Sequence, residues 1–214
     1  EAELDGILLS DHPEELMWDY AEVCKQFVGT LARRFRGEIG LSIALALITD
    51  QLEARNAEFF EESITDWHRI MVPHYTAMAH YDSAVASRLI TTIDHPFIRE
   101  LNMPRLWGIL KEGGRRRLWK FIELLNEYAL RYHLAKTVPA GARAILNQLM
   151  RATATTGQID FMGLLGMVAE TGDELDPNEL MQWVMQNSDL LGAAQSLFAH
   201  HAPPPAVQEE EGSQ

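Results

Sequence analysis

The amino-acid sequence predicts an all-α protein, built as an antiparallel multi-helix bundle with a small C-terminal helical extension. Apolar residues recur at intervals of three and four through most of the chain, which is the period of an amphipathic helix. An Asp followed closely by Pro introduces three of these stretches, as expected at helix N-termini. The period-two alternation of β-strands never persists, and the short connecting segments favour antiparallel neighbours.

Two long helical stretches are predicted in the N-terminal half. The first follows Asp11, which we expect as the N-cap, with Pro13 in the first turn and Glu14 three residues after the cap. Its apolar stripe consists of Leu16, Tyr20, Val23, Phe27 and Leu31. After two glycines, a second stretch is predicted to continue as one helix from about residue 41 to residue 72, before Pro73.

The helix with the clearest pattern lies after the middle of the chain. The segment PRLWGILKE (104–112) is predicted to form a short helix that ends at Gly113 and Gly114. The next helix should end near Lys136, before Pro139. One face of it carries Leu118, Ile122, Leu125, Ala129 and Tyr132. Shorter helical patterns follow in AILNQLM (144–150), FMGLLGMV (161–168) and PNELMQWVM (177–185).

These patterns divide the chain into three parts. We predict a helical bundle over residues 1–138 and a C-terminal helical subdomain packed on it over residues 139–201. The last segment, APPPAVQEEEGSQ (202–214), is rich in Pro and Glu, a composition that does not build a packed core. It is therefore predicted to be a disordered acidic tail.

Composition limits the classes of function. The chain has 214 residues and a formal net charge of -13, which repels nucleic acid and anionic lipid unless positive charge is gathered locally. Its one cysteine, Cys24, excludes an intrachain disulfide and fits a reducing compartment. The acidic first residues do not resemble a signal peptide. The longest apolar run, IGLSIALALI (39–48), is shorter than the about 20 residues that span a bilayer.

Positive charge is gathered in one segment. Between Arg99 and Lys120 the sequence has seven basic and two acidic residues. The candidate interaction residues of this basic patch are Arg105, Lys111, Arg115, Arg116, Arg117, Trp119 and Lys120. Three cations at a helix start oppose its macrodipole, so we expect an anionic partner for them. The alternatives are an acidic surface of this chain or of another copy, a different protein, or nucleic-acid phosphates with Trp119 stacking on a base.

Methionines in the C-terminal part form a second candidate site. The residues are Met162, Met167, Met181, Trp183 and Met185. They fit either a core of flexible side chains or an adaptable hydrophobic groove for a partner helix.

Catalytic and metal chemistry find little support in the sequence. His68, His74 and His80 recur every six residues, and a metal-dependent enzyme using them is an alternative function. Zinc ligands on one helix prefer a spacing of four, so this spacing does not predict a metal site. No nucleophile elbow is present, and we expect neither catalytic residues nor a cofactor.

The segment LNMPRLWGILKEGGRRRLWKFIELLNEYA (101–129) resembles a region of all-helical proteins of unassigned function encoded by nucleocytoplasmic large DNA viruses of protists and algae. In that group a Leu-Trp segment precedes a short charged loop and then a helix that opens with Trp-Lys-aromatic. FVGTLARRF (27–35) and the layout from AILNQLM to PNELMQWVM are also similar. Gly-Gly followed by three arginines departs from the group's Lys- and Glu-rich loop, and RRFRGE (33–38) replaces its Pro-containing stop.

The resemblance supplies no catalytic residues and implies a structural or interaction role. We therefore expect a non-enzymatic protein that is a virion-associated or assembly component of a large DNA virus. Its expected location is the virion or the host cytoplasm. Its expected partners are other proteins or further copies of itself, with nucleic acid as the alternative and no membrane span.

Overall fold

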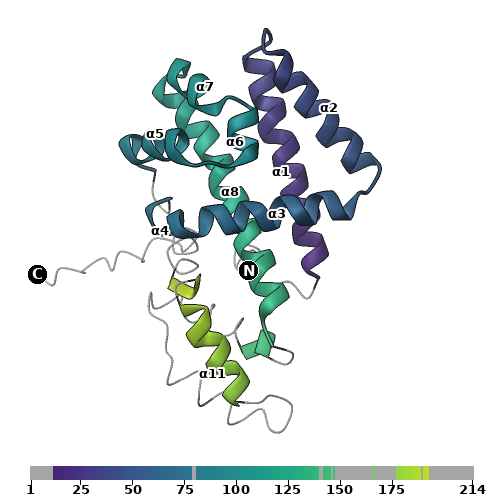
Figure 1. The fold of residues 1–214 in the computed structure, drawn as a ribbon, viewed down its shortest axis with the longest axis vertical. Coiled ribbons are helices and arrows are strands. Elements are labelled where there is room, and N and C mark those ends of the chain that lie inside the picture. Colours follow the sequence, from purple (N-terminus) through teal and green to yellow (C-terminus); the bar gives the residue numbers. More distant parts are fainter. Residues whose placement is uncertain are drawn as a thin grey trace, which may run out of the picture.

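The computed structural model describes residues 12–78, 81–139, 142–145, 147, 166, 177–188 and 190–192. These residues contain no strand, which confirms the predicted all-α class for the part of the chain described. The helices shown in Figure 1 are α1 (Pro13–Arg34), α2 (Ile39–Glu53), α3 (Ala57–Met71), α4 (Tyr75–Met78), α5 (Ser83–Thr92), α6 (Pro96–Glu100), α7 (Met103–Ile109), α8 (Glu112–Thr137) and α11 (Pro177–Gln186). A 3₁₀ turn, Val72–His74, links α3 to α4.

The 22-residue α1 and the 26-residue α8 pack side by side (Figure 1). They run antiparallel, because the last turns of α1 lie beside the first turns of α8. The predicted apolar stripes of both helices are buried, and in α1 they are joined by Met17, Cys24 and Val28. Acidic residues in the first turn of α1 and basic residues in its last turn both favour its macrodipole.

The α3 helix lies across this pair instead of alongside it (Figure 1), which differs from a simple antiparallel bundle. Trp67 of α3 is fully buried and donates a hydrogen bond from Nε1 to Oδ1 of the buried Asn126 on α8, at 2.9 Å. Further along the crossing, Tyr132 of α8 donates to Glu61 of α3 at 3.1 Å, and Lys136 forms an ion pair with the same carboxylate. Polar contacts between specific side chains therefore fix the crossing.

The predicted single helix over 41–72 is wrong, because the chain turns between α2 and α3. Arg55 has a left-handed backbone, with φ of 51°, which ends α2 and reverses the direction of the chain. Asn56 then caps α3 by accepting a hydrogen bond from the N–H of Phe59 at 3.3 Å. The start of α1 also differs, because the N-cap position is His12 and not Asp11.

The predicted break at Gly113 and Gly114 is also wrong, because both glycines lie in the first turn of α8. The α7 helix ends at Ile109, and Lys111 is the N-cap, whose carbonyl accepts from the N–H groups of Gly114 and Arg115 at 2.8 and 3.0 Å. A Cβ on Gly114 would meet Cδ2 of Leu110 at 3.0 Å. Gly114 thus lets Leu110 pack against the start of α8.

The α8 helix ends at Thr137, close to the predicted boundary at residue 138. Most of the predicted subdomain (139–201) and all of the tail (202–214) lie outside the described residues, so that division stays a prediction. Within α11, Leu180, Trp183 and Val184 are buried. No helix among the described residues is long and apolar enough to cross a membrane.

Candidate functional site

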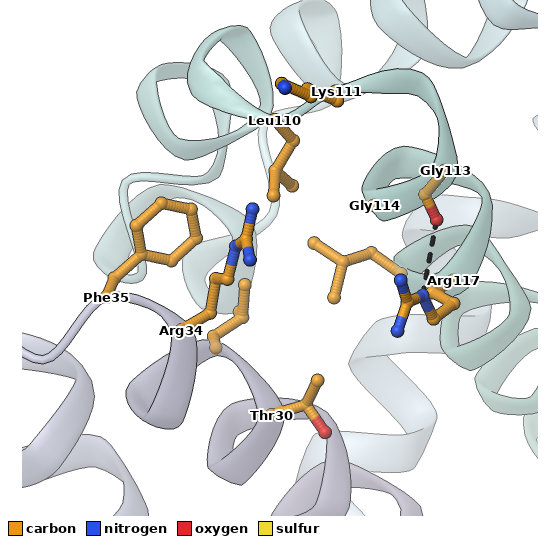
Figure 2. A pocket seen from close by; sticks show the side chains of 10 residues that line it. Thr30, Arg34, Phe35, Leu110, Lys111, Gly113, Gly114 and Arg117 are labelled. Atoms are coloured by element: carbon orange, nitrogen blue, oxygen red, sulfur yellow. Dashed lines mark hydrogen bonds between the residues drawn. The ribbon is translucent and has the colours of Figure 1, made fainter.

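A pocket of about 380 Å³ opens where the C-terminal end of α1 meets the N-terminal end of α8 (Figure 2). Its volume is in the range of small-ligand pockets. The apolar part of the lining comes from Leu31, Phe35, Leu110 and Leu118. Thr30 and the two glycines of α8 complete the wall, together with three cations, Arg34, Lys111 and Arg117.

The three cations reach the pocket from different elements. Arg34 comes from the last turn of α1, and Figure 2 shows its side chain extending towards Leu110. Lys111 sits on the α7–α8 connection, and Arg117 approaches from α8, where its Nε donates a long 3.5 Å hydrogen bond to the carbonyl of Gly113. No Asp or Glu is among the residues that line the pocket, so three positive charges face a partly apolar space without a carboxylate.

Glu112 lies between Lys111 and Gly113 of the pocket lining in the sequence, but its carboxylate contacts residues outside the pocket. Its carboxylate accepts a hydrogen bond from Ser83 Oγ at 3.1 Å and pairs with Arg116 at 3.2 Å. The neighbouring Tyr81, Ser83 and Arg116 lower the pKa of Glu112. Glu112 therefore neutralises Arg116, and no ion pair among the described residues compensates Lys111 or Arg117.

The structure places the basic residues of the predicted patch in different surroundings. Arg105 pairs with Glu38 at 2.8 Å, and Arg116 pairs with Glu112, so both meet carboxylates of this chain. Arg115 donates from Nε to the carbonyl of Trp107 at 3.1 Å. Lys111 and Arg117 line the pocket, and Lys120 is exposed on α8. The expected intramolecular partners therefore exist for some of the arginines only.

The tryptophans of this region belong to the core. Trp107 is 2% exposed and donates to Ser87 Oγ at 3.0 Å. Trp119 is 1% exposed, and its ring packs edge-to-face against that of Trp107 with centroids 6.2 Å apart. A ring buried in this way offers no face to a nucleic-acid base, so the stacking role predicted for Trp119 does not fit its position.

The first turn of α8 adds backbone polarity to the site. Lys111 provides no side-chain cap, and the N-terminus of a 26-residue helix carries positive partial charge. This charge adds to that of Lys111 and Arg117, so the α8 side of the pocket favours an anion.

The histidines predicted as alternative metal ligands do not assemble in the described residues. His68 is buried, its Nδ1 lies 3.1 Å from the hydroxyl of Tyr75, and its ring stacks on His133 at 4.2 Å. Burial, with the neighbouring His133, lowers the pKa of His68 to about 3. His74 is half-buried, and His80 lies outside the described residues. Among the residues described, no group of three or more His, Cys, Asp or Glu side chains could hold a metal ion.

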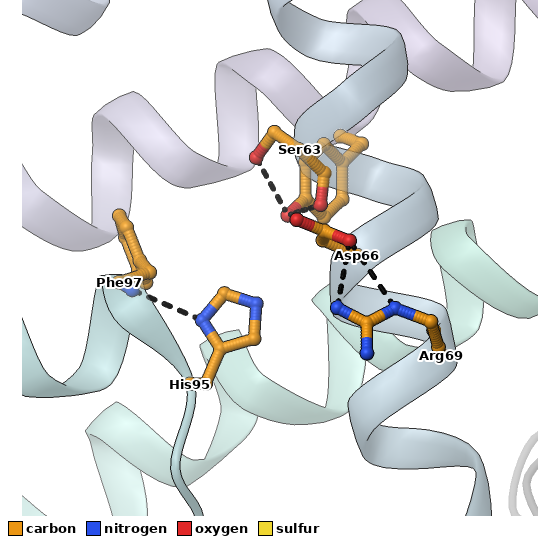
Figure 3. A network of polar contacts seen from close by, with 6 residues as sticks. Ser63, Asp66, Arg69, His95 and Phe97 are labelled. Carbon is orange, nitrogen blue, oxygen red and sulfur yellow. Dashed lines mark hydrogen bonds and ion pairs between the residues drawn. The ribbon is translucent and has the colours of Figure 1, made fainter.

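A histidine outside that trio has a structural role. His95 is 4% exposed, and its Nδ1 accepts a hydrogen bond from the N–H of Phe97 at 3.1 Å, which caps α6 (Figure 3). Burial lowers the pKa of His95 to about 4, with Asp66 and Arg69 making smaller and opposite contributions. Arg69 and Asp66, both on α3, form an ion pair at 2.9 Å near this ring (Figure 3).

The predicted methionine groove is only partly visible. Met162 and Met167 lie outside the described residues. On α11, Met181 and Met185 are 40% and 72% exposed, whereas Trp183 is 7% exposed. Two positions along a helix turn a side chain to the opposite side, so Trp183 does not share a surface with the two methionines.

Sequence reasoning found Lys111 and Arg117 but missed the α1 side of the pocket. Arg34 and Phe35 lie nearly 80 positions earlier, and nothing local links them to the basic segment. The available signal was the pair of arginines in the last turn of α1, which resembles ordinary compensation of the helix macrodipole.

Comparisons with protein-family models, curated proteins and solved structures find no match to this chain. The predicted resemblance to large-virus proteins therefore stays a prediction.

Proposed function

We propose that this chain is a non-catalytic binding protein whose pocket between α1 and α8 receives an acidic, partly apolar segment of a protein partner. The observation that supports this is the combination of three cations without a carboxylate and an apolar lining. Carboxylates of the partner would pair with Arg34, Lys111 and Arg117, while its apolar side chains would contact Leu31, Phe35 and Leu118.

An acidic peptide suits this surface better than a nucleic acid. The pocket is short and more apolar than a phosphate track, and Arg105 and Arg116 are already paired with carboxylates. Trp119 is buried, which removes the base-stacking ring. The chain's net charge of -13 repels a long polyanion beyond the patch. A role as an assembly component of a large virus is compatible with this proposal, which does not depend on it.

Fluorescence anisotropy with a labelled 12-residue peptide of alternating Glu and Leu tests the proposal. We expect binding that weakens with salt, and loss of about tenfold in affinity for each of Arg34→Gln and Arg117→Gln, because each removes a charge-assisted contact. Arg116→Gln is the matched control, since Arg116 pairs with Glu112.

Two comparison probes decide between partners. A Lys/Leu peptide of the same length should not bind. A single-stranded oligonucleotide that bound more tightly than the Glu/Leu peptide, with equal losses for Arg116→Gln and Arg117→Gln, would favour nucleic-acid binding instead. Absence of Glu/Leu peptide binding at low salt would refute the proposal.

A further inference from the structure

The exposed face of α2 is apolar. Ile39, Ile43 and Leu47 are 75%, 63% and 48% exposed, and they recur at four-residue intervals on one side of the helix. Gly40, Ser42 and Ala46 lie exposed among them. The buried side of α2 packs mainly against α1, and Figure 1 shows α2 at one edge of the ribbon. Water therefore contacts a stripe of large aliphatic side chains about two turns long.

Charged residues flank this stripe with a definite polarity. Arg36 is exposed in the connection before α2, while Asp50 and Glu53 are exposed in the last turns of the helix. The first turn of α2 has no acidic residue and its last turn no basic residue. Arg36 and Asp50 both oppose the macrodipole of α2, whereas Glu38 at the N-cap favours it and is paired with Arg105. The macrodipole of α2 therefore does not explain Arg36 and Asp50.

We propose that α2 pairs with α2 of a second copy of this chain, in an antiparallel arrangement with a two-fold axis at Ile43. Such an interface is self-complementary, because each copy supplies the same patch. Ile43 faces Ile43 of the other copy, and Ile39 faces Leu47. Gly40 comes opposite Ala46, and these small residues let the two helices approach closely.

The antiparallel arrangement also accounts for the charged residues that flank the stripe. Arg36 lies in the turn before α2 and Asp50 in the last turns of α2, so the antiparallel arrangement brings Arg36 of one copy near Asp50 of the other at both ends of the interface. The N-terminal end of each helix also faces the C-terminal end of its neighbour, which aligns their dipoles favourably. A parallel pair would instead bring like charges together. This inference uses residues outside the pocket and is independent of the proposed function.

Sedimentation velocity of the full chain tests the proposal. One helix pair forms a small interface, so we expect a monomer–dimer equilibrium with a dissociation constant of roughly 10–100 µM. Ile43→Glu should abolish the dimer, because it places two carboxylates against each other at the axis. The control is Ile109→Glu on α7, an exposed isoleucine of similar exposure (59%) outside the stripe, which should leave the dimer unchanged.

Cysteine cross-linking tests the register. Ile43→Cys should form an intermolecular disulfide under mild oxidation, whereas Ile39→Cys should not, because the two copies of position 39 are two turns apart. The native Cys24 is buried, so the unmodified chain is the background control. Arg36→Glu should weaken the dimer, and adding Asp50→Arg should restore it.

Three outcomes would overturn the proposal. The first is a monomer at every concentration together with no disulfide from Ile43→Cys. The second is equal cross-linking of the two cysteine variants, which indicates parallel or unspecific contact. The third is binding of the chain to phosphatidylcholine vesicles that is lost in Ile43→Glu, with no dimer in solution, which assigns the face to lipid.

Discussion

The two ends of the α1–α8 pair use the same helices, but one end is tightly closed and the other is open. At the closed end, α3 lies across the pair, Trp67 reaches Asn126, and the rings of His68 and His133 stack. At the open end no helix of the described residues crosses the pair, and the chain supplies long cations and glycines around a pocket of about 380 Å³.

Under the proposed function, one helix pair serves stability at one end and binding at the other. Large buried aromatic side chains such as Trp67 fill the closed end, so its contribution is to the free energy of unfolding. Arginine and lysine side chains at the open end keep their charged heads near solvent, so that end remains available to a ligand. Substitutions at the closed end should change stability, and substitutions at the open end should change binding.

The largest expected effect on the free energy of unfolding comes from a substitution at the closed end. Trp67→Ala removes a fully buried ring and leaves the amide of Asn126 without the Trp67 donor, so we expect a loss of about 3–5 kcal/mol in unfolding free energy. Chemical denaturation followed by circular dichroism measures it. Trp18→Ala on α1 is the control, because Trp18 is only partly buried, and it should cost less than half as much. Equal losses would mean that the crossing does not close this end.

The next effect is the pH dependence of stability. Burial lowers the pKa of His68 to about 3 and that of His95 to about 4, below the ordinary value of 6.5, so the folded state favours the neutral rings. This contribution is complete above pH 6.5 and is lost as the pH falls towards 4. Protonation of His95 Nδ1 would also remove the cap on Phe97. We expect a loss of roughly 1–2 kcal/mol per histidine by pH 5.

Denaturation curves between pH 7.5 and 5 check this expectation. His95→Asn keeps a capping acceptor but does not titrate in this range, so it should flatten the pH dependence whatever its effect at pH 7.5. An unchanged slope in His95→Asn would show that this ring does not contribute. Arg116→Gln at the open end should leave the slope as it is.

The smallest effect distinguishes the two glycines at the open end. A Cβ at Gly113 would meet nothing within 4 Å, so Gly113→Ala should raise stability by about 0.5–1 kcal/mol through helix propensity. At Gly114 the new Cβ meets Leu110 Cδ2 at 3.0 Å, so Gly114→Ala should gain less. Thermal unfolding of the two variants in parallel measures the difference, and a larger gain for Gly114→Ala would show that Leu110 moves away freely.

Much of the fold was predictable from local patterns. The apolar stripes of α1 and α8 lie in the core as expected, because a repeat of three and four residues marks one face of a helix directly. The break at Arg55 was not predictable, since no glycine marks its left-handed backbone in the sequence. The first turn of α8 was misplaced because Gly-Gly usually ends a helix, whereas here Gly114 makes room for Leu110.

Only the α8 side of the pocket was predictable from the sequence. Lys111 and Arg117 are conspicuous in an acidic chain, but their meeting with Arg34 depends on the antiparallel pairing of α1 with α8. Equally, the sequence could not distinguish Arg105, which pairs with Glu38, from Arg117, which has no carboxylate partner among the described residues, because Glu38 is distant in the chain and close in space. Long-range contacts of this kind carry no signature in a single sequence.

The tryptophan pair behind the pocket has a spectroscopic consequence. Trp107 and Trp119 lie 6.2 Å apart at 63°, close enough for their electronic transitions to couple and give a paired signal in circular dichroism. Arg115 of α8 donates a hydrogen bond to the carbonyl of Trp107 on α7, and Trp119 directly follows Leu118 of the pocket wall. The chain thus contains an internal optical reporter for the first turns of α8, which line the pocket.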